Sequence, residues 1–477
     1  MHTNRRDFLK KCAGVAGGSA ALSRVIPAFG GVLSNRTLEV RLRAARPNVL
    51  VLQPDQHRGT IMGCAGDKQV TTPNLDRLAA EGIHFTHCVS SSPVCSPFRG
   101  TFQTGLYPHK HGVVRNNLLL DPGFTTFAEV FAAAGYATGY IGKWHLDGGI
   151  PAEQPGGFIE PGERRQGWQQ WYGYEKSHEF FEVWKYDENR NKVRVEGYDW
   201  EPTWYTDMAL DFARRNRDAG KPWLYYIGYG PPHAPLQCPQ KYLDMYDPAG
   251  FVLPPDVVGK FPPEREQELR RILQIYYGQI TAVDFEIGRV VQGLKELGLD
   301  DNTIILYTSD HGDRLGSHCD PIKGSLRGKS QPYATAFRIP LIVRWPSGIK
   351  PGQVCDALVN SVDLAPTLLE LAGLEVPKIM QGDSMASWCL RGRGKRNEAV
   401  YFSGARWRAV WDGRYIFSPV GAFNILYDHK DDPYEMSNLF NSSEHAEAKA
   451  RMCNLLVGLA EKSEDPELPS VRAACRS

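Results

Sequence analysis

The chain of 477 residues is long enough for one large hydrophobic core and a second, smaller one. Lys and Arg total 55 against 54 Asp and Glu, so no net basic field supports nucleic-acid binding. No apolar run of about 18 residues follows the N-terminal segment, which excludes a protein with several membrane spans. The ten cysteines include no Cys-x-x-Cys pair, which argues against a structural zinc site.

The first 45 residues have the pattern of an export signal. A charged segment from Asn4 to Lys10, with the pair Arg5-Arg6, precedes an apolar stretch over 12–22 that is too short for a stable membrane span. The arginine pair resembles twin-arginine signals, which export proteins that have already folded. We therefore expect 1–45 to be a signal and leader, read by the twin-arginine export machinery. The mature protein is expected to be periplasmic or extracellular, with no membrane span.

Between residues 46 and 381, short apolar runs alternate with segments of helical periodicity. The predicted strands lie at 48–53, 136–141, 223–229, 303–308 and 339–344. The predicted helices lie at 73–81, with Thr72 as N-cap, and at 127–134, 269–297 and 362–371. Strands separated by helices predict an α/β fold, with a large, mostly parallel sheet flanked by helices on both faces.

Two further regions depart from this alternation. Residues 150–202 are rich in Gly, Pro, Trp and Tyr, and we expect an insertion over the mouth of a site. Its aromatic side chains would either stack on sugar rings or form a small core of the insertion itself. From 382 to 477, short strands at 400–402, 407–411 and 415–417 precede a helix at 443–462. These predict a smaller C-terminal α+β subdomain with an antiparallel sheet.

Polar side chains follow four of the apolar segments, where each predicted strand ends. They are Asp55 and Gln56, then Lys143 and His145, then His233, and finally Asp310 and His311. A single Asp after a strand is usually a turn or cap residue. Ligands of open α/β sheets, however, bind at the carboxyl ends of the strands, and four coincidences predict one shared site there.

A polar loop, 90–101, carries Cys95 and opens a predicted helix. A lone cysteine in such a loop fits a thiol nucleophile activated by a neighbouring cation or a helix N-terminus. It equally fits half of a disulfide or a small buried side chain, and the residues alone leave these alternatives open.

The loop belongs to a wider resemblance. Cys95-Ser-Pro97-Phe-Arg99-Gly100 resembles the Cys-x-Pro-x-Arg signature of type I sulfatases, which belong to the alkaline phosphatase superfamily. Further blocks are similar to that family's, in its order, at 48–56, 104–112, 142–145, 309–312, 328–340 and 426–439. The resemblance implies an alkaline phosphatase-like catalytic domain at 46–381 and a smaller domain at 382–477.

The resemblance also implies an unusual nucleophile. In the family, a separate maturation enzyme oxidises the cysteine that Cys95 matches to Cα-formylglycine. One hydroxyl of the hydrated aldehyde attacks the sulfur of a sulfate ester. The second hydroxyl then loses its proton, so that the aldehyde re-forms and sulfate leaves.

By the same resemblance, a divalent cation would be bound by Asp55, Gln56, Asp310, His311 and the converted residue 95. Because the donors are mostly oxygen, we expect Ca²⁺, with Mg²⁺ or Mn²⁺ as alternatives. Gln56 stands where Asp is commonest in the family, and His311 stands where other members have Asn. Gln with His also occurs in phosphonate and phosphodiester hydrolases of the superfamily, so that activity remains an alternative.

The positively charged side chains in the motif blocks would bind the negatively charged sulfate ester. The resemblance implies that Arg99 steadies the diol, and that Lys143 and Lys329 bind the sulfate oxygens. It implies that His145 hydrogen-bonds a diol hydroxyl and assists elimination, and that His233 binds substrate and protonates the leaving alcohol.

Three other histidines in motif-like blocks, His109, His111 and His318, have either substrate-facing or structural loop roles.

Taken together, the residues and the resemblance predict an exported, metal-dependent sulfatase. We expect its substrate to be a sulfated carbohydrate or a sulfated small molecule, because of the family and the export signal. The alternatives are a phosphodiester or phosphonate monoester hydrolase with the same nucleophile, and an inactive protein that binds sulfated glycans.

Overall fold

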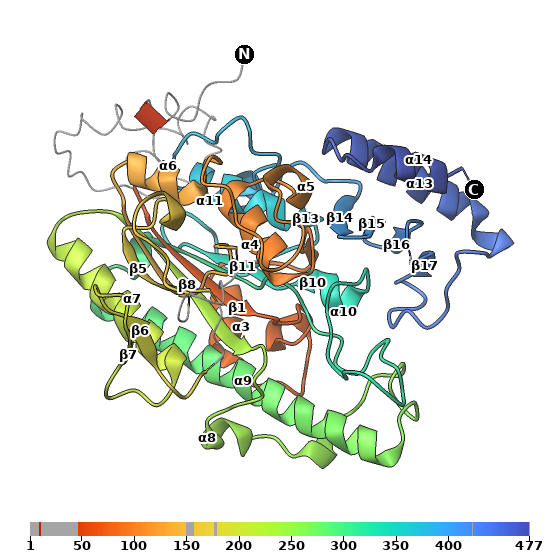
Figure 1. The fold of residues 1–477 in the computed structure, drawn as a ribbon, viewed down its shortest axis with the longest axis horizontal. Helices are drawn as coiled ribbons and strands as arrows, with labels where there is room; N and C mark the ends of the chain where they lie inside the picture. Colours follow the sequence, from red (N-terminus) through yellow and green to blue (C-terminus); the bar gives the residue numbers. More distant parts are fainter. Residues whose placement is uncertain (1–8, 11–45, 149–156, 176–178, 422, 477) are drawn as a thin grey trace.

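The computed structural model describes residues 9–10, 46–148, 157–175, 179–421 and 423–476, so the predicted export signal lies almost wholly outside the described residues. An eight-stranded sheet crosses the molecule, with helices on both sides (Figure 1). Its strands, in spatial order, are β12 (Gln353–Cys355), β2 (Ile83–Phe85), β11 (Leu341–Arg344), β9 (Thr303–Thr308), β1 (Asn48–Asp55), β8 (Trp223–Pro232), β4 (Ala137–Lys143) and β5 (Gln170–Tyr174). The run from β9 to β5 is parallel, and β11 is antiparallel to both β9 and β2. The predicted large, mostly parallel sheet is confirmed.

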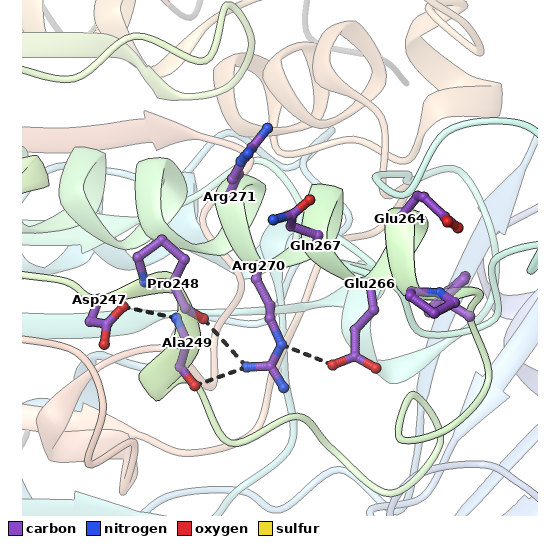
Figure 2. A pocket seen from close by; sticks show the side chains of 10 residues that line it. Asp247, Pro248, Ala249, Glu264, Glu266, Gln267, Arg270 and Arg271 are labelled. Carbon is purple, nitrogen blue, oxygen red and sulfur yellow. Dashed lines mark hydrogen bonds and ion pairs between the residues drawn. The ribbon is translucent and has the colours of Figure 1, made fainter.

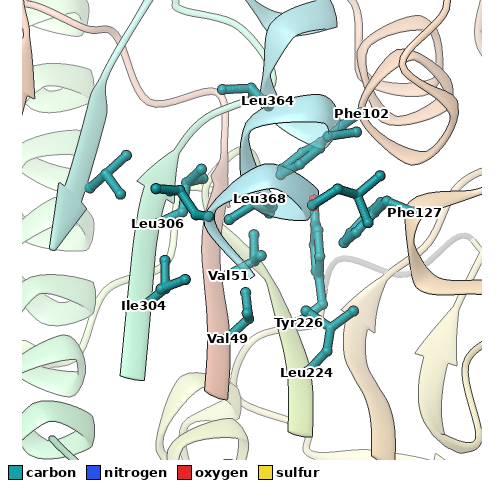
Figure 3. Packing of buried hydrophobic residues seen from close by; sticks show 14 of the residues in the cluster. Val49, Val51, Phe102, Phe127, Leu224, Tyr226, Ile304, Leu306, Leu364 and Leu368 are labelled. Carbon is teal, nitrogen blue, oxygen red and sulfur yellow. The ribbon is translucent and has the colours of Figure 1, made fainter. Parts of the chain in front are cut away.

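The central strands are buried on both faces, which explains why they are continuous apolar runs in the sequence. Side chains along β1 alternate, so Val49 and Val51 face one core while Leu50 and Leu52 face the other. Figure 3 shows the first core, where residues of β9, β1 and β8 meet residues of three helices. Its labelled members are Val49, Val51, Phe102, Phe127, Leu224, Tyr226, Ile304, Leu306, Leu364 and Leu368.

Three helices cover each face of the sheet. The core of Figure 3 lies under α4 (Cys95–Thr104), α6 (Phe127–Ala133) and α11 (Leu364–Leu371). The opposite face is covered by α3 (Pro73–Ala80), α7 (Glu201–Asp218) and α9 (Pro263–Glu296). Four shorter helices lie elsewhere in this part of the chain. They are α5 (Pro108–His111), α8 (Gln240–Leu243), α10 (Ala334–Phe337) and α12 (Ala386–Arg391).

Several predicted boundaries are wrong. Helix α9 begins at Pro263 rather than at residue 269, because its first two turns are polar and lack the apolar period that marks the rest. Thr72 precedes α3 but does not cap it through its side chain; instead its hydroxyl accepts a hydrogen bond from the Gly63 N–H, at 2.9 Å. Strand β4 begins one residue later than predicted and continues to Lys143, where Gly142 (φ 99°) packs against Gly228 of β8.

The predicted strand at 339–344 is divided by Pro340, which has no N–H to donate to a ladder. The first part, β10 (Arg338–Ile339), pairs with β3 (Cys88–Val89) in a small sheet that also holds β13 (Val359–Asn360). The second part is β11 of the main sheet. The chain thus changes sheets at the proline.

The expected insertion at 150–202 contributes to the main sheet. Its strand β5 pairs in parallel with β4, and a hairpin of β6 (Trp184–Tyr186) and β7 (Lys192–Arg194) follows. The ring centroids of Trp168 and Trp171 lie 5.3 and 5.1 Å from that of Tyr140 on β4. These two tryptophans therefore complete the core of the main sheet, and the expectation of a sugar platform or a separate core is wrong for them.

The predicted smaller antiparallel sheet is confirmed. It consists of β14 (Val400–Gly404), β15 (Trp407–Trp411), β16 (Tyr415–Ser418) and β17 (Ile425–Asp428). Helices α13 (Ala446–Lys462) and α14 (Leu468–Ala474) cover its outer face at one end of the molecule (Figure 1). The inner face packs on Val89 and Phe337, and the Trp407 indole donates to the Ser330 carbonyl at 3.0 Å. Among the described residues, no helix is both long and apolar enough to cross a membrane.

Candidate active site

The parallel arrangement of β9, β1, β8 and β4 brings the predicted polar residues to one edge of the sheet. Asp55 ends β1 and Lys143 ends β4, while His233 follows β8 and Asp310 follows β9. These strands are neighbours in the sheet, so their carboxyl ends meet. Cys95, the first residue of α4, faces the same point.

Cys95 lies at the centre of this group and is only 1% exposed. Its Sγ atom is 3.0 Å from Lys329 Nζ, 3.3 Å from His311 Nε2, 3.6 Å from Lys143 Nζ and 3.8 Å from Asp55 Oδ1. Burial and Asp55 act to raise the pKa of the Cys95 thiol, but Lys143, Lys329 and His311 hold it well below its ordinary value. The surroundings thus favour a negative charge at this atom.

Arg99 lies one turn after Cys95 on α4 and is 1% exposed. Its NH2 atom is 3.3 Å from Asp55 Oδ2 and 3.3 Å from Asp310 Oδ2, and its NH1 atom donates to the Lys143 carbonyl at 2.5 Å. One guanidinium thereby connects the ends of β1, β9 and β4. Because its donors form a planar fork, the three strand ends are held at fixed relative positions.

The pKa values of the two carboxylates of the site are shifted in opposite directions. Asp55 Oδ2 is 2.6 Å from Lys143 Nζ; burial acts to raise the pKa of Asp55, but Lys143 and the other cations hold it well below its usual range. Burial and the nearby Asp55 raise the pKa of Asp310 to about 6.

The donor set fits a divalent cation. Ligand atoms of Asp55, Cys95, Asp310 and His311 all lie within 4.8 Å of one another, and all four residues are buried. His311 donates from Nδ1 to the Gly312 carbonyl at 2.8 Å, which directs Nε2 toward the carboxylates. Burial acts to lower the pKa of His311, but Asp310 raises it above its ordinary value.

Gln56 lies beside this group, in a left-handed backbone conformation with φ 71°. Its N–H donates to Asp310 Oδ1 at 2.9 Å, and its side-chain Nε2 donates to Asp313 Oδ2 at 2.7 Å. The Gln56 Oε1 atom accepts from Lys329 Nζ at 3.5 Å. The structure therefore brings the predicted ligands Asp55, Gln56, Cys95, Asp310 and His311 together.

Two predicted histidines border the group. His145 is buried, its Nε2 is 3.0 Å from Asn117 Oδ1, and burial lowers its pKa while a hydrogen bond with Cys95 acts to raise it. His233 donates from Nδ1 to the Ala234 carbonyl at 2.7 Å. Burial lowers the pKa of His233 to about 4, although the negative charge of Asp55 acts in the other direction.

The three other histidines of the motif-like blocks have structural partners away from Cys95. His109 Nε2 donates to the Ser463 carbonyl at 2.8 Å, and His111 Nε2 is 3.1 Å from the Thr101 hydroxyl. His318 Nε2 is 3.0 Å from Glu435 Oε2, and its ring stacks on Tyr333 with centroids 3.7 Å apart. These contacts favour the structural alternative for all three.

Sequence reasoning missed two residues that touch the site. Asp313 is fully buried against Gln56, and Asn117, in a left-handed conformation with φ 63°, contacts His145. Asp313 follows Asp310 by only three positions, but a loop carboxylate shows no periodicity that separates it from a solvated one.

A surface hollow of about 860 Å³ lies at the first turns of α9 and shares no residue with this group. Figure 2 shows that its central side chain, Arg270, is already engaged: it donates to Glu266 Oε1 at 2.9 Å and to the carbonyls of Pro248 and Ala249, both at 3.3 Å. These bonds tie the 247–249 loop to α9, so we assign this hollow a structural role.

Comparisons with known proteins agree with the chemistry of the Cys95 group. The family pattern described as Sulfatase matches residues 47–374, and the pattern described as N-sulphoglucosamine sulphohydrolase, C-terminal, matches residues 327–462. The Ulvan-active sulfatase of Formosa agariphila is 32% identical over 86% of this chain and 80% of its own length. The N-acetylglucosamine-6-O-sulfatase of Bacteroides thetaiotaomicron is 28% identical over 88% of each chain.

The fold leads to the same family. A solved structure from Bacteroides fragilis, described as a candidate sulfatase, has a TM-score of 0.82 and 29% identity, and covers 90% of this chain and 98% of that chain. With the Sulfatase pattern extending over most of the sequence, the chain belongs to the sulfatase family of the alkaline phosphatase superfamily, and it is a sulfuric ester hydrolase.

Proposed function

We propose that this protein hydrolyses sulfate monoesters of a carbohydrate, with residue 95, after conversion to formylglycine, at the reacting centre. The observation that carries the proposal is the position of Cys95 Sγ within 3.6 Å of two lysine ammonium groups and beside two buried carboxylates. The sugar is suggested by a relative whose name specifies N-acetylglucosamine.

The converted residue would supply a hydroxyl nucleophile, whose acidity would be increased by a divalent cation when one is bound. Asp55, Gln56, Asp310 and His311, with residue 95, would bind the cation. Three of these side chains offer oxygen, which favours Ca²⁺, with Mg²⁺ and Mn²⁺ as alternatives. His311 offers nitrogen, a donor that Mn²⁺ accepts more readily than Ca²⁺.

The cationic side chains of the site receive the sulfate group. Lys143 and Lys329 present their ammonium groups to Cys95 from β4 and from the 313–333 loop. From these positions, the two ammonium groups would stabilise the negative charge that develops on the ester during bond cleavage. Arg99 fixes the ends of β1, β4 and β9, and so holds Lys143 at a fixed distance from the two carboxylates.

His145 and His233 are proposed to transfer protons during the reaction. His145, beside residue 95, would accept the proton that is lost when sulfate leaves. His233 would donate a proton to the leaving alcohol. A bound sulfate ester would bring a negative charge that acts to raise the pKa of His233 from its low value in the free protein, in the direction that the donor role requires.

The proposed cellular context follows from the N-terminal sequence. A twin-arginine-type signal over 1–45 would export the folded protein to the periplasm or beyond, after a maturation enzyme has converted Cys95. The catalytic region is proposed to extend over 46–381, with the C-terminal subdomain over 382–477.

A second candidate activity has a specific observation in its favour. Gln56 in place of an acid removes one negative charge from the site, and a phosphodiester or phosphonate monoester carries the same single charge as a sulfate monoester, so the charge of the site suits either class. His311 is the other member of the pair that the sequence shares with hydrolases of those esters.

The test is a comparison of substrates with full-length protein made alongside a formylglycine-generating enzyme. We expect turnover of 4-nitrophenyl sulfate and of sulfated amino sugars to exceed that of bis(4-nitrophenyl) phosphate and phenylphosphonate esters. A dominant phosphodiester rate would overturn the sulfatase proposal in favour of the second candidate. Binding of sulfated glycans without any turnover would indicate the inactive binding protein.

The nucleophile is tested separately by the mass of the peptide that carries residue 95. Cys95→Ala should abolish turnover, whereas Cys88→Ala, an equally buried cysteine on β3, should retain it. An unmodified Cys95 in active protein would contradict the proposed mechanism.

A further inference from the structure

Asp313 is a buried carboxylate for which the proposed mechanism has no role. It is 0% exposed and lies in the loop that links Asp310 to Lys329. Its Oδ2 atom accepts from Gln56 Nε2 at 2.7 Å and from Arg327 Nε at 2.5 Å, while its Oδ1 atom accepts from the Gly328 N–H at 2.9 Å. One side chain therefore contacts a proposed cation ligand and the segment that carries a proposed sulfate-binding lysine.

The first contact determines how the Gln56 amide is oriented. Both oxygens of Asp313 accept hydrogen bonds from N–H groups, so Gln56 turns its NH₂ group toward Asp313. The amide oxygen then points the other way, to Lys329 Nζ at 3.5 Å. The backbone of Gln56 is held as well, because its carbonyl accepts from the Tyr276 hydroxyl at 2.7 Å and its N–H donates to Asp310.

The second contact fixes Lys329. On one side of it, Gly328 donates to Asp313; on the other, the Ser330 N–H donates to the carbonyl of Pro93, two residues before Cys95, at 3.0 Å. Arg327, bound to Asp313, also donates to the carbonyl of Pro232 at 2.9 Å, next to His233. Lys329 is thus anchored on both sides, and through Asp313 it is connected to the position of Gln56.

The contact between Gln56 and Asp313 also accounts for the amide at position 56. A carboxylate there would face Asp313 at hydrogen-bonding distance, and two like charges that close repel each other. An amide and a carboxylate form a matched donor and acceptor, whereas two acids do not.

We propose that Asp313 is the positioning residue of this active site: it directs the Gln56 amide oxygen and holds the turn that presents Lys329. The inference rests on the proposed function for the roles of Gln56 and Lys329. Asp313 itself does not touch the reacting atoms and acts through these two neighbours.

Asp313→Asn tests the proposal, because either orientation of the new amide places an NH₂ group against donors that Asp313 now accepts from. We expect Ca²⁺ affinity, measured by calorimetry on the full-length protein, to fall about 10–100-fold, the usual effect of removing such a partner. KM for 4-nitrophenyl sulfate should rise about tenfold or more. Asp284→Asn is the matched control: Asp284 is equally buried but binds Asn74 and Leu75 on α3, and the variant should change neither quantity beyond about twofold.

Two further variants separate the two contacts. Arg327→Met leaves the bond between Gln56 and Asp313 in place, so KM should rise while Ca²⁺ affinity stays within about twofold of wild type. Gln56→Glu combined with Asp313→Asn reverses donor and acceptor, so the double variant should bind Ca²⁺ at least about tenfold more tightly than the product of the single effects predicts.

The proposal is overturned if Asp313→Asn keeps wild-type Ca²⁺ affinity and KM, or if the double variant is simply additive. Should Asp313→Asn fail to fold, an unchanged KM in Arg327→Met overturns the role in presenting Lys329. These outcomes are distinct from failure of the proposed function. If wild-type protein does not turn over 4-nitrophenyl sulfate, the sulfatase proposal fails, while the Ca²⁺ measurements still decide whether Asp313 positions Gln56.

Discussion

The buried carboxyl group of Glu201 makes the stability of the folded protein depend on pH. Glu201 opens α7, is 5% exposed, and its Oε2 atom has no hydrogen-bond partner among the described residues. Burial raises the pKa of Glu201 from 4.5 to about 8, and the hydroxyl of Tyr205 offsets only part of this rise. At neutral pH the folded protein therefore keeps a proton that the unfolded chain has lost.

The sign and size of the effect follow from this difference in proton binding. Between pH 4.5 and about 8, only the folded state holds the proton, so the free energy of unfolding falls as the pH rises. Each unit of pH lowers it by about 1.4 kcal/mol, and the whole window lowers it by at most about 5 kcal/mol. Above that window both states are ionised and the loss is complete.

Equilibrium unfolding in urea between about pH 5 and pH 9 measures this dependence. Glu201→Gln removes the titrating group. The free energy of unfolding of this variant should therefore equal that of wild type at the acidic end of the range and exceed it by several kcal/mol at the alkaline end. Asp428→Asn is the control: the hydrogen bond from Arg414 lowers the pKa of Asp428 to about 2, below the window, and Arg414 stays charged throughout it. A stability difference between Glu201→Gln and wild type that stays constant with pH would refute the reasoning.

Three other predictions concern the site. Arg99→Met should lower kcat for 4-nitrophenyl sulfate about 10³-fold and lower the free energy of unfolding by about 3–5 kcal/mol, because Asp55 and Asp310 lose their shared buried partner. Steady-state kinetics measure the first effect and urea unfolding measures the second. An unchanged kcat would contradict this prediction. Gly142→Ala should destabilise by about 2–3 kcal/mol, since its Cβ would lie 2.1 Å from the Gly228 carbonyl oxygen; thermal unfolding tests this, and a wild-type Tm speaks against it. Dialysis against EDTA should abolish turnover and added Ca²⁺ should restore it, whereas full activity in protein shown to be metal-free would exclude the cation.

Much of the sheet is predictable from the sequence because its central strands are buried on both faces. Segments 49–52 and 304–306 are wholly apolar, and the polar residues that follow these segments mark the strand ends. The predictions fail where the local sequence pattern does not determine the structure. The first turns of α9 lack apolar periodicity, and β5 joins the sheet through its pairing with β4, a contact between distant segments that local pattern does not encode.

The residues of the site likewise include some that the sequence pattern predicts and some that it does not. Asp55, Lys143 and Asp310 are predictable because parallel strands deliver their ends to one edge. Cys95 on its own was ambiguous, and its significance came from the family motif rather than from any physical pattern. Asp313 was not predictable, because its importance arises only when the loop folds back to place Gln56 and Gly328 against one carboxylate.

The hydrogen bond from Trp407 to Ser330 has a consequence for how this protein can be divided. Ser330 follows Lys329, and the same small sheet that supplies Trp407 also covers Phe337 and Val89. The proposed boundary near residue 381 is therefore a division in topology but not in function. A chain shortened there, or recombined with the C-terminal part of another protein, would lose a support of the segment that carries Lys329, the proposed sulfate-binding lysine. The two parts are therefore expected to be inherited and engineered as a unit.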